Sequence, residues 1–338
     1  MDTLPRRLTR AAVWSADGVR VREVELPAPG PGELLVRVDL ATVCGSDLHT
    51  VSGRRSAPSP SILGHEAVGR VVAAGPGADQ EAGDRIVWSV TAICGRCARC
   101  RRGFTAKCEH VRKVGHEAFT GDWPLSGGYA EHILLPTGVT TVSVPETVPD
   151  AVAAPAGCAT ATVMAVLDAA GDLAGRRRGI CGAGMLGVTA VGACAERGAR
   201  VSISDPHPER RDLASRFGAA PDTGGGSVDI VLDFSGSATA VAAALSRLDL
   251  GGTVVLAGSV TPGPTVALDP EAVVRGWLTI TGVHNYEPRH LVHAVEFLTR
   301  THDTLPWNGL VAAPVGLDAI DTVLTPPPRE VLRASVNP

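Results

Sequence analysis

Four cysteines within a short stretch constrain this chain more than any other feature. Cys94, Cys97, Cys100 and Cys108 follow the spacing C-x2-C-x2-C-x7-C. Four thiolates can surround one tetrahedral ion, and zinc bound in this way has no open coordination position. The spacing therefore predicts a closed, structural zinc lobe over residues 94–108, which would stabilise the fold without taking part in catalysis.

Disulfide pairing and an iron–sulfur cluster are two weaker alternatives for these cysteines. An iron–sulfur cluster also takes four thiolates, whereas disulfides belong to oxidising compartments. The chain of 338 residues begins without the apolar segment of a secretory signal, and it has no apolar run of the about 20 residues that span a bilayer. We therefore expect a cytoplasmic protein with reduced cysteines and no membrane partner.

Composition narrows the class of protein further. Apolar residues make up 44% and charged residues 20% of the chain, which is typical of a globular protein and leaves room for two domains. The net charge of −4 argues against a nucleic-acid partner, because phosphate binding needs a basic surface. The basic run at residues 176–178 is interpreted as a solvated turn ahead of a strand.

The first half of the chain has the pattern of a β domain. Short β-rich runs are separated by glycine and proline, as expected for a compact barrel. The expected strands cover residues 11–14, 19–26, 33–43, 68–73 and 84–90.

Two polar clusters interrupt these strands. One contains Cys44, Ser46, Asp47 and His49, and the other is the Gly-His-Glu triplet around His65. A cysteine and a histidine at strand ends are suitable zinc ligands, but a catalytic zinc site needs a third protein ligand and an open fourth position. A second Gly-His-Glu triplet, at residues 115–117, leaves either histidine possible from sequence alone; we prefer His65, because the second triplet lies in an irregular stretch.

The residue pattern changes near residue 151, from short β-rich runs to a sequence that favours helices. An alanine-rich segment, residues 152–170, predicts one or two helices and contains Cys158, which is either a small core residue or the missing ligand. Strands and helices then alternate, and a Gly-x-Gly-x-x-Gly motif lies between a strand and a helix. An acidic residue ends the next strand about 20 residues later, so the motif predicts a dinucleotide-binding site. Its residues are Gly182, Gly184, Gly187 and Asp205.

Further elements are expected to complete this second half. Strands are predicted over residues 229–234, 253–257 and 278–281, and a helix over residues 238–248. A helix over residues 291–300 and a short strand near residues 331–336 would return the chain to the first domain.

These motifs together resemble the zinc-dependent alcohol dehydrogenases of the medium-chain dehydrogenase/reductase family. The resemblance covers essentially the whole chain. It implies an α/β protein with a GroES-like β-barrel catalytic domain and a Rossmann domain with a doubly wound parallel sheet. We place the catalytic domain at residues 1–154 and 288–338, with the zinc lobe at 94–108, and the Rossmann domain at 155–287.

The resemblance also implies roles for individual residues. Cys44, His65 and Cys158 match the ligands of a catalytic zinc, Glu66 matches an acid behind the metal that approaches it in some members, and Asp47 matches the carboxylate that orients the histidine. Ser46 and His49 match a proton relay. The cofactor contacts would come from Thr162, Gly182, Gly184, Gly187, Asp205, Arg210 and Arg333.

A finer resemblance points to a branch associated with phosphonate metabolism. It rests on five stretches, at residues 87–90, 113–117, 126–132, 155–163 and 282–286. A phosphonate group would need cations in the pocket, and guanidinium groups match phosphoryl oxygens. The candidate substrate residues are Arg54, Arg55, Trp88 and His116. For each of them, the alternative is an ordinary surface or core residue with no role in substrate binding.

The expected reaction is reversible hydride transfer between an alcohol and a nicotinamide cofactor, with two zinc ions per chain. Asp205 favours NAD over NADP, because a carboxylate binds the ribose 2′-hydroxyl and repels a 2′-phosphate. The substrate would be a phosphonate-bearing alcohol such as 2-hydroxyethylphosphonate. A polyol or another secondary alcohol is the alternative, and a non-catalytic binding or regulatory paralogue is a remote one. We expect a homodimer or homotetramer.

Overall fold

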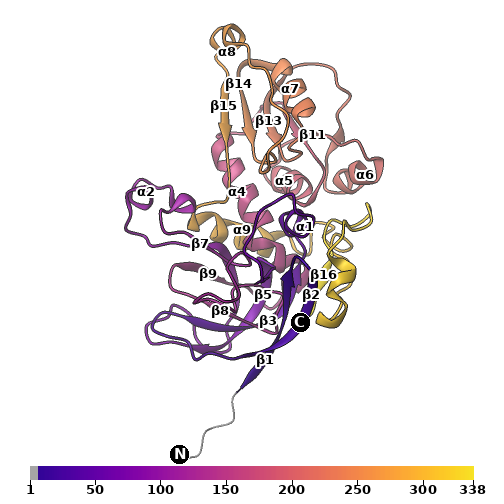
Figure 1. Cartoon of the computed structure of the whole chain (residues 1–338). Coiled ribbons are helices and arrows are strands. Elements are labelled where there is room, and N and C mark those ends of the chain that lie inside the picture. Colours follow the sequence, from indigo (N-terminus) through magenta and orange to yellow (C-terminus); the bar gives the residue numbers. More distant parts are fainter. Residues whose placement is uncertain (1–6) are drawn as a thin grey trace, which may run out of the picture. The chain divides into compact units, whose positions relative to one another are not determined.

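The computed structural model describes residues 7–338. The chain divides into two compact units (Figure 1). Unit 1 contains Met1–Cys158, Glu287–Thr299 and Val311–Pro338, and unit 2 contains Ala159–Tyr286 and Arg300–Leu310.

Unit 1 is built on two antiparallel sheets. The smaller has the strand order β2-β1-β4, and the larger has the order β16-β3-β5-β6-β7, with β8 paired to β3 and β9 paired to β6. The strands are β1 Leu8–Ser15, β2 Gly18–Glu25, β3 Leu34–Thr42, β4 Ser61–Ile62, β5 Glu66–Ala74, β6 Arg85–Ala92, β7 Arg112–Lys113, β8 His132–Leu135, β9 Val139–Ser143 and β16 Ser335–Val336.

Burial follows the position of each strand. The exposed strand β2 alternates between exposed and half-buried residues, whereas all eight residues of β6 are buried. Burial of every residue of β6 fits its apolar centre, Ile86, Val87 and Trp88, while its polar Ser89 is held by a hydrogen bond to the Thr91 carbonyl. Its Trp88 lies in the main core together with Ile62, Leu125 and Tyr129.

The helices of unit 1 are short, apart from α9. They are α1 Gly45–Val51, α2 Ala98–Arg101, η1 Thr105–Lys107, α3 Asp150–Ala153, η2 Ala154–Gly157, α9 Pro288–Thr301 and η3 Leu317–Val323. The last residues of α9 belong to unit 2. The zinc lobe, which carries α2 and η1, is joined to the start of α9 by Glu287. The Glu287 carboxylate accepts hydrogen bonds from the Thr105 hydroxyl, the Thr105 amide and the Ala106 amide.

Unit 2 contains a six-stranded parallel sheet in the order β12-β11-β10-β13-β14-β15. Its strands are β10 Arg178–Cys181, β11 Val201–Ser204, β12 Ala220–Pro221, β13 Val228–Asp233, β14 Leu248–Leu256 and β15 Thr279–Gly282. Its helices are α4 Ala159–Ala170, α5 Met185–Glu196, α6 Pro208–Arg216, α7 Ala238–Arg247 and α8 Pro270–Gly276. Strands and helices alternate along the chain, as expected for a doubly wound fold.

The observed units differ from the sequence-based domain boundaries at residues 155–158, 287 and 300–310. Residues 155–158 lie in unit 1, because η2 packs on β6 so closely that a Cβ at Gly157 would lie 2.3 Å from the Trp88 carbonyl oxygen. Residues 300–310 lie in unit 2 rather than unit 1. They are held there by the Arg300–Glu196 ion pair at 2.6 Å and by Trp307, whose ring centroid is 5.1 Å from that of Phe217.

Within residues 7–338, no single helix has the length and apolar character required to cross a membrane. The bent pair Asp150–Gly157 and Ala159–Ala170 meets the criterion jointly, by length and composition only.

Candidate active site and metal centres

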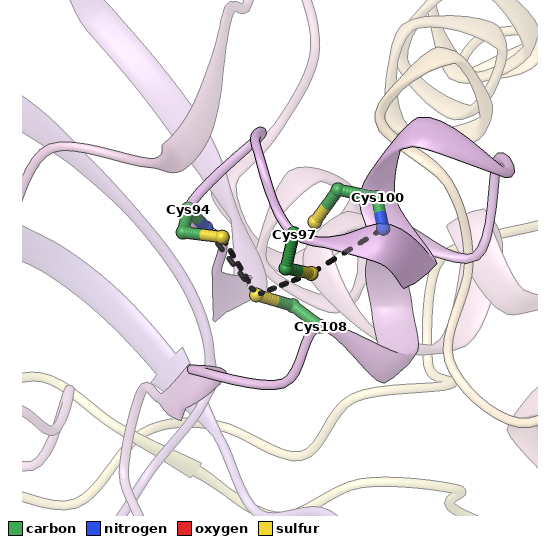
Figure 2. A group of neighbouring side chains, drawn as sticks. All are labelled: Cys94, Cys97, Cys100 and Cys108. Atoms are coloured by element: carbon green, nitrogen blue, oxygen red, sulfur yellow. Dashed lines mark hydrogen bonds between the residues drawn. The ribbon is translucent and has the colours of Figure 1, made fainter.

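The four cysteines of the lobe converge on one point. Figure 2 shows their side chains directed toward one another from a loop and the short helix α2. Their sulfur atoms all lie within 4.8 Å of one another. Contacts of 3.5 Å between Cys108 and Cys94 and 3.9 Å between Cys97 and Cys108 are far longer than a disulfide bond. The donor set fits the closed four-thiolate site that the spacing predicts.

Backbone amides donate hydrogen bonds to these sulfur atoms, which favours the thiolate form that binds a cation. The Cys100 amide donates to the Cys97 sulfur at 3.4 Å, and the His110 amide donates to the Cys108 sulfur at 3.3 Å. Hydrogen bonds from the backbone at Glu109 and Cys100 lower the pKa of Cys97 to about 6, whereas burial and the neighbouring thiols raise the pKa of Cys100 to about 12. The cluster therefore favours thiolate at one sulfur and retains a proton at another, which a bound cation would replace.

A second cluster brings together Cys44, His65, Glu66 and Cys158. One ligand atom from each lies within 4.8 Å of the others. Cys44, His65 and Glu66 are buried and Cys158 is half-buried. Two sulfurs, one imidazole nitrogen and a nearby carboxylate are a donor set suited to zinc. Cys158 is 92 residues beyond Glu66 in the sequence, so only the fold brings it to the other three.

Local structure explains how each side chain reaches this point. Cys44 follows β3 and precedes α1, His65 directly precedes β5, and Cys158 directly follows η2. The turn before His65 requires glycine, because Gly64 has a φ of +90° and a Cβ there would lie 2.7 Å from the Tyr129 ring.

Asp47 orients His65 within the cluster. Asp47 is fully buried, and its Oδ1 lies 3.3 Å from Nδ1 of His65. Its Oδ2 accepts hydrogen bonds from the Cys44 amide and the Tyr129 hydroxyl, both at 3.0 Å. With Nδ1 facing the carboxylate, Nε2 of His65 is the nitrogen available to a metal. The sequence pattern assigned no such role to Tyr129, which is 82 residues from Asp47.

The electrostatics of this second cluster favour a bound cation. A hydrogen bond with Cys158 lowers the pKa of Cys44, against the effect of burial, and the Cys158 pKa is correspondingly raised. Burial acts to lower the pKa of His65, but the Asp47 carboxylate and Cys44 outweigh it and leave this pKa raised. The cluster thus stabilises positive charge at the point where its donor atoms meet.

Glu66 is held on the opposite side by two partners. The Thr42 hydroxyl donates to Oε2 of Glu66 at 2.8 Å, and the Arg333 guanidinium donates to both carboxylate oxygens at 2.8 and 3.1 Å. Strand register explains the first contact, since Thr42 lies opposite Glu66 between β3 and β5. Nη2 of Arg333 also lies 3.8 Å from the Cys44 sulfur. The sequence suggested neither partner for Glu66; the pyrophosphate contact expected of Arg333 stays a prediction.

The two residues of the predicted proton relay lie on α1. The Ser46 hydroxyl is 3.2 Å from Nε2 of His65, beside the metal-binding atoms. His49 follows three residues later, which places both side chains on one face of the helix. Burial and the nearby Arg54 lower the pKa of His49, so its imidazole is neutral near pH 7. Within residues 7–338 its buried Nδ1 has no hydrogen-bond partner.

The candidate substrate residues separate into three groups. His116 is half-buried beside the cluster, with its ring centroid 5.1 Å from that of His65, and the half-buried Arg55 reaches its Nε2 at 3.4 Å. Arg54 is exposed, and its Nε is 3.5 Å from the Ser52 hydroxyl. Trp88 is 1% exposed and belongs to the core of unit 1. A role as a core residue therefore describes Trp88 better than a role in substrate binding.

The glycine motif in unit 2 has the geometry of a dinucleotide site. Gly182 directly follows β10 with a φ of +92°, and a Cβ at Gly187 would lie 1.8 Å from the Gly182 carbonyl oxygen. In contrast, nothing lies within 4 Å of a Cβ at Gly184, the N-cap residue directly before α5. Two glycines are thus required by the fold, and the third leaves open space at a helix N-terminus, where a pyrophosphate would bind.

Asp205 lies directly after β11, next to this motif. Its carboxylate accepts hydrogen bonds from the Ala183 amide at 2.8 Å and the His207 amide at 2.9 Å. Nη1 of Arg211 donates to the Asp205 carbonyl oxygen at 2.6 Å. The other two expected cofactor residues, Arg210 on α6 and Thr162 on α4, also belong to unit 2. Their cofactor contacts stay predictions.

Comparison with known proteins agrees with this arrangement. Residues 30–146 match the alcohol dehydrogenase GroES-like domain, and residues 186–300 match the zinc-binding dehydrogenase family. The L-threonine 3-dehydrogenase of Deinococcus deserti is 32% identical over 312 residues, which cover 85% of each chain. That of Pyrococcus abyssi is 32% identical over 300 residues, which cover 82% of this chain and 81% of the relative.

Solved structures show the same fold. An alcohol dehydrogenase from Thermotoga maritima has a TM-score of 0.89 and 27% identity, covering 98% of this chain and 100% of the other. A zinc-binding dehydrogenase from Sinorhizobium meliloti, bound to NADP, has a TM-score of 0.88, 27% identity and the same coverage. The predicted GroES-like and Rossmann fold class is therefore confirmed. This chain belongs to the zinc-dependent alcohol dehydrogenases of the medium-chain dehydrogenase/reductase family, oxidoreductases that act on CH–OH groups.

Proposed function

We propose that this enzyme is an NAD-linked dehydrogenase of an alcohol that carries an anionic group, with a phosphonate such as 2-hydroxyethylphosphonate as its substrate. The observation that supports this proposal is a group of cations beside the Cys44–His65–Cys158 cluster. Arg55 contacts His116, which packs on His65. Arg55 and Lys113 both lower the pKa of His116, after burial and His65. Within residues 7–338, neither cation has a carboxylate partner.

The positive charges of Arg55 and Lys113 are suited to binding an anionic substrate, because no carboxylate of the described residues pairs with them. Lys113 is half-buried, and burial, Arg55 and Lys107 all lower its pKa. A phosphonate or carboxylate next to Arg55 and Lys113 would relieve this repulsion, and guanidinium–phosphoryl hydrogen bonds are among the stronger ones in proteins.

In the proposed reaction, Cys44, His65 and Cys158 hold a zinc ion. When bound, the ion supplies a Lewis acid that lowers the pKa of the substrate hydroxyl, and the nicotinamide cofactor accepts the hydride. Ser46 lies next to these ligands; its oxygen would accept the hydroxyl proton while its own proton passes on toward His49. His49 is neutral near pH 7 because its pKa is lowered, so it can accept the proton and release it to solvent.

We propose NAD as the cofactor, because the Asp205 carboxylate lies beside the glycine motif. This carboxylate is held by two backbone amides beside the glycine motif, where it would repel a 2′-phosphate. The relative bound to NADP makes NADP the alternative. Comparing kcat/KM for the two cofactors tests this assignment, and an Asp205→Asn variant should reduce the preference for NAD. A wild-type preference for NADP would contradict it.

The substrate proposal is tested with a panel of alcohols. We expect kcat/KM for 2-hydroxyethylphosphonate to exceed that for ethanol, benzyl alcohol and sorbitol at least tenfold, which corresponds to about 1.4 kcal/mol. L-threonine belongs in the panel as the second candidate, because relatives 32% identical to this chain are L-threonine 3-dehydrogenases. A preference for L-threonine would replace the phosphonate by a carboxylate, and a preference for sorbitol would favour the polyol alternative.

An Arg55→Ala variant identifies the anion contact. It should lower kcat/KM for the phosphonate at least tenfold and leave that for benzyl alcohol nearly unchanged, because benzyl alcohol has no anionic group. Arg22→Ala is the matched control, since Arg22 is an exposed arginine on β2. Equal losses for both substrates in Arg55→Ala would mean that Arg55 supports the fold rather than the anion.

We also propose that two copies of the chain associate through β15. This strand lies at an edge of the six-stranded sheet, where backbone groups are available for a further strand. Large apolar side chains are exposed around it, with Trp277 at 81%, Val274 at 72% and Ile280 at 37%. A second β15 edge would cover both the strand and these side chains.

A further inference from the structure

Five arginines line one cavity in unit 2, away from the glycine motif. The cavity has a volume of about 570 Å³ and includes Arg176, Arg177, Arg178, Arg200 and Arg247 in its wall. It lies where β10, β11 and β13 begin, since Arg178, Val201 and Val228 are the first residues of these strands. The glycine motif follows β10 at its other end, so the cavity is separate from the cofactor site.

Two of the five arginines are neutralised by the protein. Arg177 forms ion pairs with Asp229 at 2.8 Å and with Asp249. Arg247 forms a two-pronged ion pair with Asp222, at 2.6 and 3.1 Å. Five guanidinium groups therefore face three carboxylates, which leaves two positive charges uncompensated among these eight side chains.

The other three arginines have no carboxylate partner within residues 7–338. Nη2 of Arg176 donates to the backbone carbonyls of Asp229 and Gly251, at 3.3 and 3.1 Å. Arg178 is only 6% exposed, and its Nη1 donates to the Arg200 carbonyl. Its Nε is buried and has no partner among the described residues. A buried guanidinium without a counter-ion is unfavourable, so Arg178 is poorly explained by the fold alone, while Arg176 is half-buried and Arg200 is exposed.

A glycine-rich loop contributes to the wall of the same cavity. Residues 224–226 are three consecutive glycines between β12 and β13, and Gly225 lines the cavity. The carbonyls of Gly225 and Gly226 accept hydrogen bonds from Arg247. Within the described chain, their amides have no acceptor. Nothing lies within 4 Å of a Cβ at Gly225, and its φ is not in the left-handed region. The protein's own packing therefore does not require glycine at this position, whereas close approach of a ligand would.

We propose that this cavity is a second anion site, which binds the phosphate group of a small phosphorylated molecule. The two uncompensated charges match a phosphate dianion, and arginine side chains with free backbone amides are the donors that bind such groups. The volume admits a ligand larger than inorganic phosphate alone.

Calorimetric titration with pyrophosphate tests this site directly. The enzyme is first saturated with NADH, so that the glycine motif after β10 is occupied. We expect the saturated wild-type enzyme to bind pyrophosphate, and the saturated Arg55→Ala variant, in which the proposed substrate contact is removed, to keep one pyrophosphate per chain. An Arg176→Ala/Arg200→Ala double variant should bind at least tenfold more weakly, and Arg216→Ala, at the end of α6 and outside the cavity wall, should bind as the wild type does.

A second variant separates binding from folding. Gly225→Ala adds a methyl group where the protein leaves open space, so its melting temperature should stay unchanged while its affinity for pyrophosphate falls. The proposal is overturned if the saturated enzyme binds no pyrophosphate, or if the double variant and Arg216→Ala lose affinity equally. It is also overturned if Gly225→Ala binds pyrophosphate as the wild type does, or if a single-stranded oligonucleotide binds more tightly than pyrophosphate.

Discussion

At the scale of single residues, two buried carboxylates determine the arrangement of the Cys44–His65–Cys158 cluster. Asp47 faces the nitrogen of His65 that points away from the cluster, and Glu66 lies among the ligand atoms themselves. Burial raises the pKa of Glu66, and the Arg333 guanidinium opposes this effect. The two acids therefore have different roles, one in orienting a ligand and one in balancing the charge of Arg333.

Replacing Asp47 by Asn should weaken metal binding at this cluster. The amide cannot stabilise positive charge on the His65 ring as the carboxylate does, and loss of such a partner typically lowers metal affinity about 10- to 100-fold. Competition with a chromogenic zinc chelator would measure the change. The four-cysteine site serves as the internal control, because Asp47 does not contact it; loss of both zinc ions together would contradict this assignment.

Replacing Arg333 by Met should destabilise the protein. The change leaves the Glu66 carboxylate buried without its counter-ion, a loss that typically costs about 3–5 kcal/mol. Urea unfolding would measure the free energy. An Arg333→Met/Glu66→Gln double variant should regain part of it, since the unpaired charge is gone; a double variant as unstable as the single one would show that packing, not charge, is responsible.

At the scale of elements, hydrogen bonds and ion pairs of charged side chains join segments that are apart in the sequence. Glu287 at the start of α9 holds η1 of the zinc lobe. In unit 2, Arg247 at the end of α7 holds Asp222 in the loop before β13. Both contacts attach a loop to a helix end, which limits the motion of loops that have few apolar contacts of their own.

The Arg247–Asp222 pair predicts a pH-dependent stability. Arg247 lowers the pKa of Asp222 below its usual value, so the pair contributes fully above the unfolded pKa of about 3.9 and is lost as the pH falls through the lower folded value. Arg247→Met should therefore cost about 1 kcal/mol at neutral pH, allowing for solvent screening. Urea unfolding across pH values should show this difference shrinking below about pH 4. A difference independent of pH would assign the effect to packing.

At the scale of the whole molecule, the exposed apolar side chains beside β15 predict an assembly. A Trp277→Asp variant should remain folded, because Trp277 is 81% exposed, but it should dissociate, because a charge would be buried at the contact. Light scattering after size exclusion would then report the chain mass of 34.7 kDa for the variant and at least twice that for the wild type. Equal masses would exclude this edge as the interface.

Much of the site could be predicted from local sequence. The lobe cysteines, the segment from Cys44 to Glu66 and the glycine motif each lie within a short stretch, and the chemistry of such stretches follows from residue type and spacing. Cys158 lies far outside that segment, and only the family resemblance matched it to the other ligands. The alternating strands and helices of residues 178–282 were predictable for the same reason. The boundaries near residues 155 and 300 were not, because they depend on which unit Gly157 and Trp307 pack against.

The sequence by itself predicted the donor residues of the two clusters, the dinucleotide motif and the order of the elements, because residue type, local spacing and the family resemblance identify them. Only the tertiary structure decided that Arg333 and Thr42 hold Glu66, that Tyr129 holds Asp47, and that Arg178 is buried in a cationic cavity rather than exposed in a turn. These contacts join residues up to 267 positions apart. Spacing does not encode them, because strand register and packing bring such residues together only when the whole chain has folded.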